Sequence, residues 1–191
     1  MEQLISDQFH RSIEAKIDHV EALTAPLEAA AGIMTDCLLN DGKLLVCADG
    51  RAEALANTLA HCMLNGQQLE RPGLPTLVLN QLNHDINAND DPFSAQIRAL
   101  SKPQDVLVLI SPGPVSKQLL AAVSTAQQCG LAIVALSAPG HEALTTLLQG
   151  QKSAAELIAN NDCPYRIHEI HMLILFCLCE LIEHKLFGVT N

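Results

Sequence analysis

Short apolar runs alternate with helical stretches along most of this chain, and that alternation restricts the fold more than any other feature. Four short, mostly apolar runs are suited to strands that are buried on both faces: residues 43–47, 74–79, 105–110 and 131–136. Helical patterns separate them at 53–64, 93–100 and 115–129. We therefore expect an α/β fold, a three-layer αβα arrangement with a mainly parallel sheet, and a weaker run at 155–159 would supply the fifth strand.

The two ends of the chain have a helical pattern. Ile5, Phe9, Ile13 and Ile17 recur at every fourth position, and a second apolar face follows Pro26. We expect an N-terminal helical hairpin in residues 1–40, and an αβα core in 41–191 that ends in a long helix after the polar turn at 160–164. At 191 residues, the chain is expected to form one domain, 1–191.

Composition excludes several classes of function. Hydrophobic residues make up 49% of the chain but aromatic ones only 3%, and the net charge is −10, so direct nucleic-acid binding is not expected. The seven cysteines form an odd set within apolar runs, which is typical of a reduced interior. The sequence lacks a basic or apolar leader, and the apolar stretch at 172–179 is too short for a bilayer, so we expect a cytoplasmic protein without a membrane segment.

Residues 105–118 predict a strand that runs into a helix through a Ser/Gly/Pro turn. Such turns bind anions through converging backbone N–H groups, and Ser111 and Ser116 add hydroxyls. Pro112 and Pro114 have no N–H, however, so two backbone donors are missing. The turn fits a weakened phosphate site, or a helix cap by Ser111 or Gly113 with no ligand.

Three histidines are candidates for a metal site. His168 and His171 are three residues apart on the predicted C-terminal helix, and His61 would join them if the two helices faced each other. No carboxylate is firmly placed to complete a zinc site. The sequence therefore favours no cofactor, with zinc as the alternative.

Several motifs, in register over the whole length, resemble the SIS (sugar isomerase) domain family, and phosphoheptose isomerases in particular. They are Cys-Ala-Asp-Gly at 47–50, Glu-Arg-Pro-Gly-Leu-Pro at 70–75, Asn-Asp at 89–90, Ile-Ser at 110–111, Arg-Ile-His-Glu-Ile-His-Met at 166–172 and Cys-Leu-Cys-Glu-Leu-Ile at 177–182. The resemblance implies a sugar-phosphate site near Asp49, Arg51, Ser111, Ser116 and Asp90.

The same resemblance implies that the catalytic positions of an isomerase have changed. The family's glutamate base falls at His61, a glutamine falls at His168, and the catalytic histidine falls at Phe176. A phenylalanine carries no proton, so the acid/base pair would be incomplete.

The C-terminus resembles a second branch of the family, the DiaA-type proteins that associate with the initiator DnaA. In them an exposed Leu-Phe pair, here Leu186 and Phe187, contacts DnaA, and a homotetramer bridges several initiators. We therefore interpret the chain first as a non-catalytic adaptor that forms a homo-oligomer and binds DnaA. The alternatives are a phosphoheptose isomerase-like enzyme acting on sedoheptulose 7-phosphate, or a phosphosugar-binding sensor.

Overall fold

The computed structural model describes residues 1–48, 50–66, 70–80, 91–151 and 153–188. A five-stranded sheet lies at its centre, with strand order β2-β1-β3-β4-β5 and parallel pairing throughout. The strands are β1 (Leu44–Ala48), β2 (Thr76–Val78), β3 (Val106–Ile110), β4 (Ala132–Ser137) and β5 (Ala154–Ile158). All five expected strands are therefore present, and the parallel αβα fold class is confirmed.

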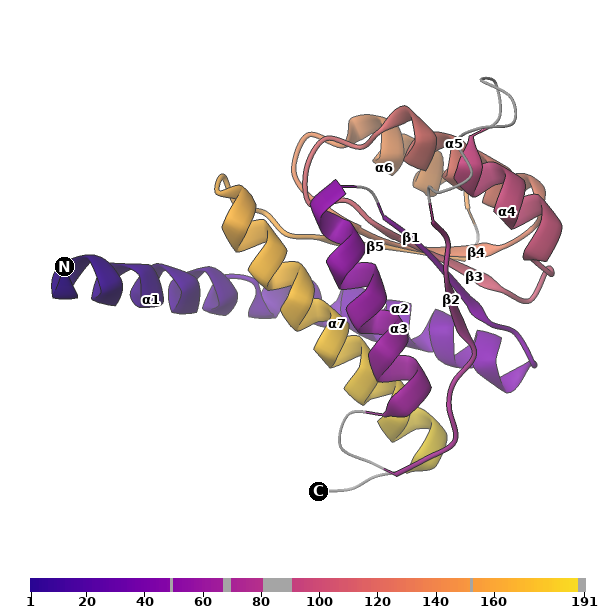
Figure 1. Cartoon of the computed structure of the whole chain (residues 1–191), viewed down its shortest axis with the longest axis horizontal. Coiled ribbons are helices and arrows are strands. Elements are labelled where there is room, and N and C mark those ends of the chain that lie inside the picture. The colour runs from indigo at the N-terminus through magenta and orange to yellow at the C-terminus, as the bar shows by residue number, and fades with distance from the viewer. Residues whose placement is uncertain (49, 67–69, 81–90, 152, 189–191) are drawn as a thin grey trace.

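Helices cover both faces of the sheet (Figure 1). One layer contains α2 (Val20–Leu39), α3 (Glu53–Asn65) and α7 (Pro164–Phe187), and the other contains α4 (Pro92–Leu100), α5 (Lys117–Gln128) and α6 (Glu142–Gln149). Alternate residues of β1 enter the two cores: Leu44 and Val46 face the first layer, and Leu45 and Cys47 face the second. This is why β1 and β3 are apolar at every position.

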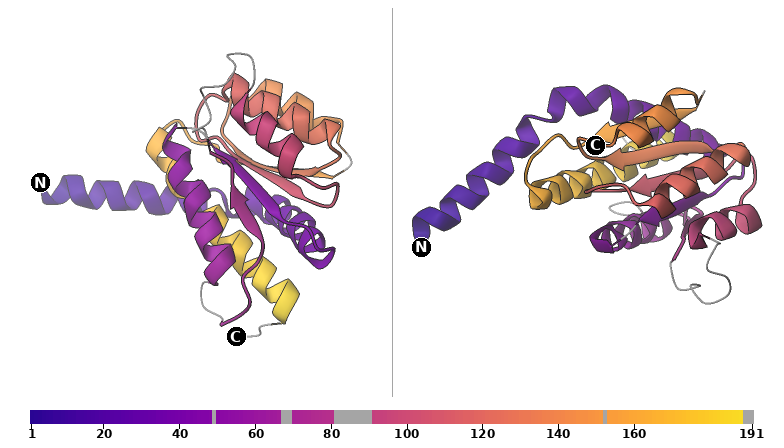
Figure 2. Two further views of the ribbon diagram at one scale, coloured as in Figure 1. Left: turned by 45° about the vertical axis from the view of Figure 1, so that its right-hand side comes forward. Right: turned by 90° about the horizontal axis from the view of Figure 1, so that it is seen from above.

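The two N-terminal helices are present as α1 (Glu2–Ile17) and α2, and the chain turns between them at Asp18 and His19. Pro26, after which we expected the second helix, lies inside α2. Helix α1 runs outward from the body instead of folding back along α2, as Figure 2 shows. Its apolar stripe, which includes Ile5, Phe9 and Ile13, is exposed in this single chain.

Helix α2 is the one described helix whose length and mean hydropathy, 1.3, would also suit a membrane span. Its contacts explain the apolar sequence differently, because it packs against α7 and β5. Ala30, Ala31 and Met34 are completely buried there. An interior helix of an αβα core meets the same length and hydropathy criteria as a membrane helix.

Candidate functional site

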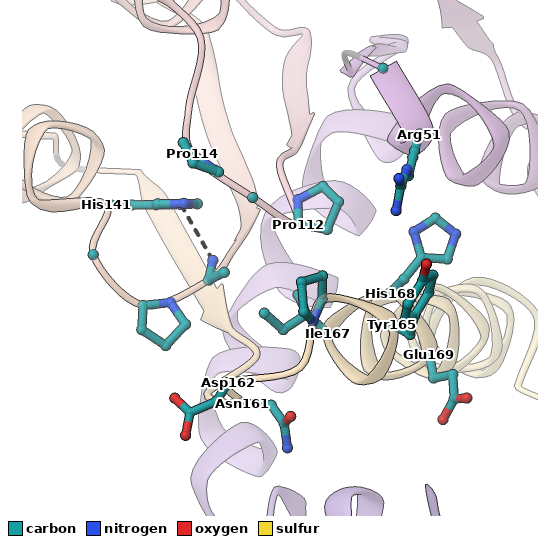
Figure 3. A pocket seen from close by; sticks show the side chains of 16 residues that line it. Arg51, Pro112, Pro114, His141, Asn161, Asp162, Tyr165, Ile167, His168 and Glu169 are labelled. Carbon is teal, nitrogen blue, oxygen red and sulfur yellow. Dashed lines mark hydrogen bonds between the residues drawn. The ribbon is translucent and has the colours of Figure 1, made fainter. Parts of the chain in front are cut away.

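A pocket of about 920 Å³ lies where the strands end and the following loops converge. Its walls come from four segments that are distant in the sequence: η1 (Gly50–Ala52) after β1, the turn after β3, the loop after β4, and residues 161–169 after β5. Ligand sites in open parallel sheets lie at this edge, beyond the carboxyl ends of the strands. Figure 3 shows the side chains that line the pocket.

The turn after β3 uses its hydroxyls for its own structure. The Ser111 hydroxyl donates a hydrogen bond to the Gly113 carbonyl at 3.0 Å, and Ser111 is completely buried. The Ser116 hydroxyl accepts from the Leu119 amide at 3.2 Å and caps α5, the role that we expected Ser111 or Gly113 to have. Pro112, Gly113 and Pro114 form the pocket wall, whereas neither serine lines it.

Arg51 lies opposite that turn. It extends from η1 toward α7, where its guanidinium lies 5.8 Å from the centre of the Tyr165 ring. His168, one turn further along α7, also lines the pocket beside Arg51 (Figure 3). Of the predicted ligand-binding residues, Arg51 therefore reaches the pocket, whereas Asp49 and Asp90 lie outside the described residues.

His141 holds two walls of the pocket together. Its Nδ1 accepts a hydrogen bond from the Ala138 amide at 3.3 Å, and a backbone hydrogen bond links it to Gly113 of the neighbouring turn. Burial lowers the pKa of His141, against the opposing effects of the Gly113 bond and the nearby Glu156 carboxylate. His141 therefore ties the loop after β4 to the turn after β3.

His171 lies deeper, below the pocket. Its Nε2 donates to the Ser137 carbonyl at 2.9 Å, and its Nδ1 has no hydrogen-bond partner among the described residues. Burial lowers the pKa of His171 to about 4; the bond to Ser137 opposes this shift, and the neighbouring His168 and His141 add to it. This histidine is therefore neutral at pH 7.

Glu169 lines the pocket, but its carboxylate is already paired with other side chains. It accepts hydrogen bonds from Ser12 at 2.6 Å and from Arg166, and it pairs with Lys16. Burial acts to raise the pKa of Glu169, but the hydrogen bonds from Ser12 and Arg166 and the two positive charges lower it overall. Asp162 is the other carboxylate among the described residues that line the pocket.

The three predicted metal ligands do not come together. His61 is exposed on α3, next to Asn65 and outside the pocket, while the Nε2 of His171 is bonded to Ser137. The described part of the chain contains no group of three His, Cys, Asp or Glu side chains that could hold a metal ion. The three predicted histidines therefore do not fit a zinc site.

The catalytic positions implied by the resemblance are also separate from the pocket, except for His168. Phe176 is 41% exposed on α7, two turns beyond His168, and neither Phe176 nor His61 lines the pocket. Tyr165, Asp162 and His141 also line the pocket, and none of them was predicted from the sequence. The signal for Asp162 was the polar turn at 160–164, because it follows a strand that ends at the same edge as the other loops.

The end of α7 is fastened to α3. A buried ion pair joins Arg71 and Glu183 at 2.8 Å, and Arg71 also donates to the carbonyls of Cys62 and Met63. Phe187 covers Arg71, with the guanidinium 5.9 Å from its ring centre. Leu186 is partly buried against the core, so the predicted exposure fails for Leu186, whereas Phe187 remains 41% exposed while it contacts Arg71.

Comparison with known proteins assigns the chain to a family. The SIS domain profile matches residues 8–138. The chain belongs to the SIS domain family. A phosphoheptose isomerase from Methylococcus capsulatus is 36% identical over 190 residues, covering 96% of both chains, and one from Shewanella denitrificans is 35% identical over 193 residues, covering 98% of this chain and 97% of the relative.

Solved structures agree with these sequence relatives. A phosphoheptose isomerase from Francisella tularensis superposes with a TM-score of 0.87 at 31% identity, covering 96% of this chain and 98% of that one. The phosphoheptose isomerase GmhA from Neisseria gonorrhoeae gives a TM-score of 0.83 at 30% identity, covering 95% and 98%. This similarity contradicts our first interpretation, a non-catalytic adaptor that binds DnaA, and supports the isomerase-like alternative.

Proposed function

We propose that this SIS-family chain is a sugar-phosphate isomerase of the phosphoheptose type, which acts on sedoheptulose 7-phosphate in the pocket at the strand ends. The observation that carries the proposal is the identity of 36% with a phosphoheptose isomerase over 96% of both chains. The pocket supports it, because loops from four strand ends enclose about 920 Å³, within the range of small-molecule sites.

The reaction moves one proton between neighbouring carbons. A base takes a proton from C1 of the ketose, which leaves an enediolate with its charge on the oxygen of C2. Return of the proton to C2, and transfer of the O1 hydroxyl proton to O2, give the aldose. The step balances without an oxidant or reductant, so it requires one well-placed proton carrier and a means of holding the chain of carbons.

Asp162 is the candidate for that proton carrier. Glu169 accepts hydrogen bonds from Ser12 and Arg166, and His141 is held by its hydrogen bonds to Ala138 and Gly113. Among the described residues that line the pocket, Asp162, His168 and Tyr165 are then the remaining side chains that could transfer a proton. The Tyr165 ring lies against the guanidinium of Arg51. His168 lies beside Arg51, whereas Asp162 lies on the opposite side of the pocket (Figure 3).

A second candidate function is binding of the same sugar phosphate without turnover. The position of Phe176 favours it, because the resemblance puts a catalytic histidine there and the ring lies outside the pocket. A protein with that change would keep the cavity and lose one proton-transferring group.

Turnover and binding, measured on the same purified full-length protein, separate the two functions. Isomerisation of sedoheptulose 7-phosphate should be measurable for the wild type, and Asp162→Asn should lower kcat by about a hundredfold or more, because a positioned base contributes that much. Glu180→Gln, an equal change of charge at an exposed position on α7, is the matched control and should leave kcat unchanged. Calorimetric binding by a wild type that gives no turnover would favour the second candidate.

A further inference from the structure

The turn after β3 is poorly equipped to hold a phosphate group. Pro112 and Pro114 have no N–H to donate, and they are two of the three turn residues that form the pocket wall. The Ser111 hydroxyl donates to Gly113, and the amide of Ser111 donates to the Leu136 carbonyl at 2.9 Å. The donors of a phosphate site must therefore come from another wall.

Arg51 supplies the missing charge. Among the described residues that line the pocket, it is the only lysine or arginine. The chain as a whole has a net charge of −10, so a dianionic ligand is repelled by the general field and needs a local cation. A guanidinium also offers a planar fork of N–H donors that matches two phosphate oxygens.

The surroundings of Arg51 leave that fork available. The described part of the chain contributes no hydrogen bond or ion pair to its guanidinium, and its recorded contact is the Tyr165 ring at 5.8 Å. Glu169, which follows His168 in the sequence, forms its ion pairs with Arg166 and Lys16 and not with Arg51. His168 lies beside Arg51 and adds an imidazole donor to the same corner (Figure 3).

We infer that Arg51, assisted by His168, binds the phosphate group of the sugar phosphate, in place of the turn at 111–116. This assignment rests on the proposed function and fixes the direction of the substrate. The phosphate occupies the corner between η1 and α7, and the carbon chain runs past Pro112 and Ile167 toward Asp162. Arg51 thereby selects phosphorylated over neutral sugars.

Calorimetry on the full-length protein tests the assignment, with sedoheptulose 7-phosphate and unphosphorylated sedoheptulose as probes. Arg51→Gln should weaken binding of the phosphorylated sugar by about tenfold or more, because a charge-assisted bidentate contact is lost. It should leave binding of the neutral sugar unchanged. Lys117→Gln is the matched control, since Lys117 is an exposed cation at the start of α5, next to the turn and outside the pocket.

The outcomes separate this inference from the function on which it rests. Loss of affinity in Arg51→Gln, with Lys117→Gln equal to wild type, supports the assignment. Equal affinity of Arg51→Gln and wild type, or an equal loss in both variants, overturns it while the sugar-phosphate function stands. If the wild type neither turns over nor binds sedoheptulose 7-phosphate at millimolar concentration, the proposed function is overturned. The assignment of Arg51 then fails with it.

Discussion

Acidification should destabilise this protein through His171, by an amount that follows from its burial. The imidazole is completely buried, and its pKa is about 4 instead of the ordinary 6.5. Above pH 6.5 the ring is neutral in both the folded and the unfolded chain. As the pH falls below 6.5, the unfolded chain takes up a proton that the folded chain refuses, so stability is lost.

The two pKa values give the size of the effect. Between pH 7 and pH 5, His171 should lower the free energy of unfolding by about 2 kcal/mol, and the loss should approach about 3 kcal/mol near pH 4. The loss is a large fraction of the stability of an ordinary domain, about 5–15 kcal/mol. It should be visible as a lower urea midpoint at pH 5.

The comparison uses urea unfolding of wild type and His171→Gln at pH 7 and pH 5, at one protein concentration. Glutamine keeps an N–H donor for the Ser137 carbonyl but does not titrate. Each protein is compared with itself, so the packing cost of the substitution and the contribution of His141 cancel. The variant should lose about 2 kcal/mol less than wild type on acidification; equal losses would refute the reasoning about His171.

Three other predictions concern the rest of the chain. Asp105→Ala should cost about 3 kcal/mol in urea unfolding, because the buried carboxylate accepts from the Lys43 and Lys102 amides and pairs with the Lys43 side chain; a cost under 1 kcal/mol would contradict that role. Phe187→Ala should lower stability by about 1 kcal/mol through the lost contact with Arg71, and an unchanged melting temperature would show that the contact is idle. Light scattering should give a dimer or tetramer, because the apolar stripe on α1 is exposed in one chain; a monomer at micromolar concentration would remove this expectation.

The strands could be predicted from the sequence because burial on both faces leaves a strong signal. Every residue of β1 and β3 is buried, which requires an unbroken apolar run. Helix α6 was not predicted; it is a short helix of eight residues that begins two residues after the Pro-Gly turn. The direction of α1 could not be predicted either. Apolar residues at every fourth position indicate which face of the helix is apolar, but not what that face packs against.

The sequence predicts which pocket residues follow the ends of strands. It does not predict features that depend on side-chain packing. Arg51 and the proline turn come directly after β1 and β3, so their shared location follows from parallel pairing. The roles of Ser111 and Ser116 depended on which backbone group each hydroxyl meets. We predicted His61 at the site from its position in the sequence relative to the family motifs. In the structure, His61 lies on the exposed face of α3.

Proton exchange into sedoheptulose 7-phosphate in D2O tests the central claim most directly, because it detects carbon deprotonation even when net isomerisation is slow. The signal measured by proton NMR is that of the two hydrogens on C1 of the ketose, one of which the base must remove. The account predicts that the wild type replaces this hydrogen with deuterium and that Asp162→Asn does so about a hundredfold more slowly. Retention of both C1 hydrogens by sugar phosphate that is bound to the wild type would contradict the isomerase function.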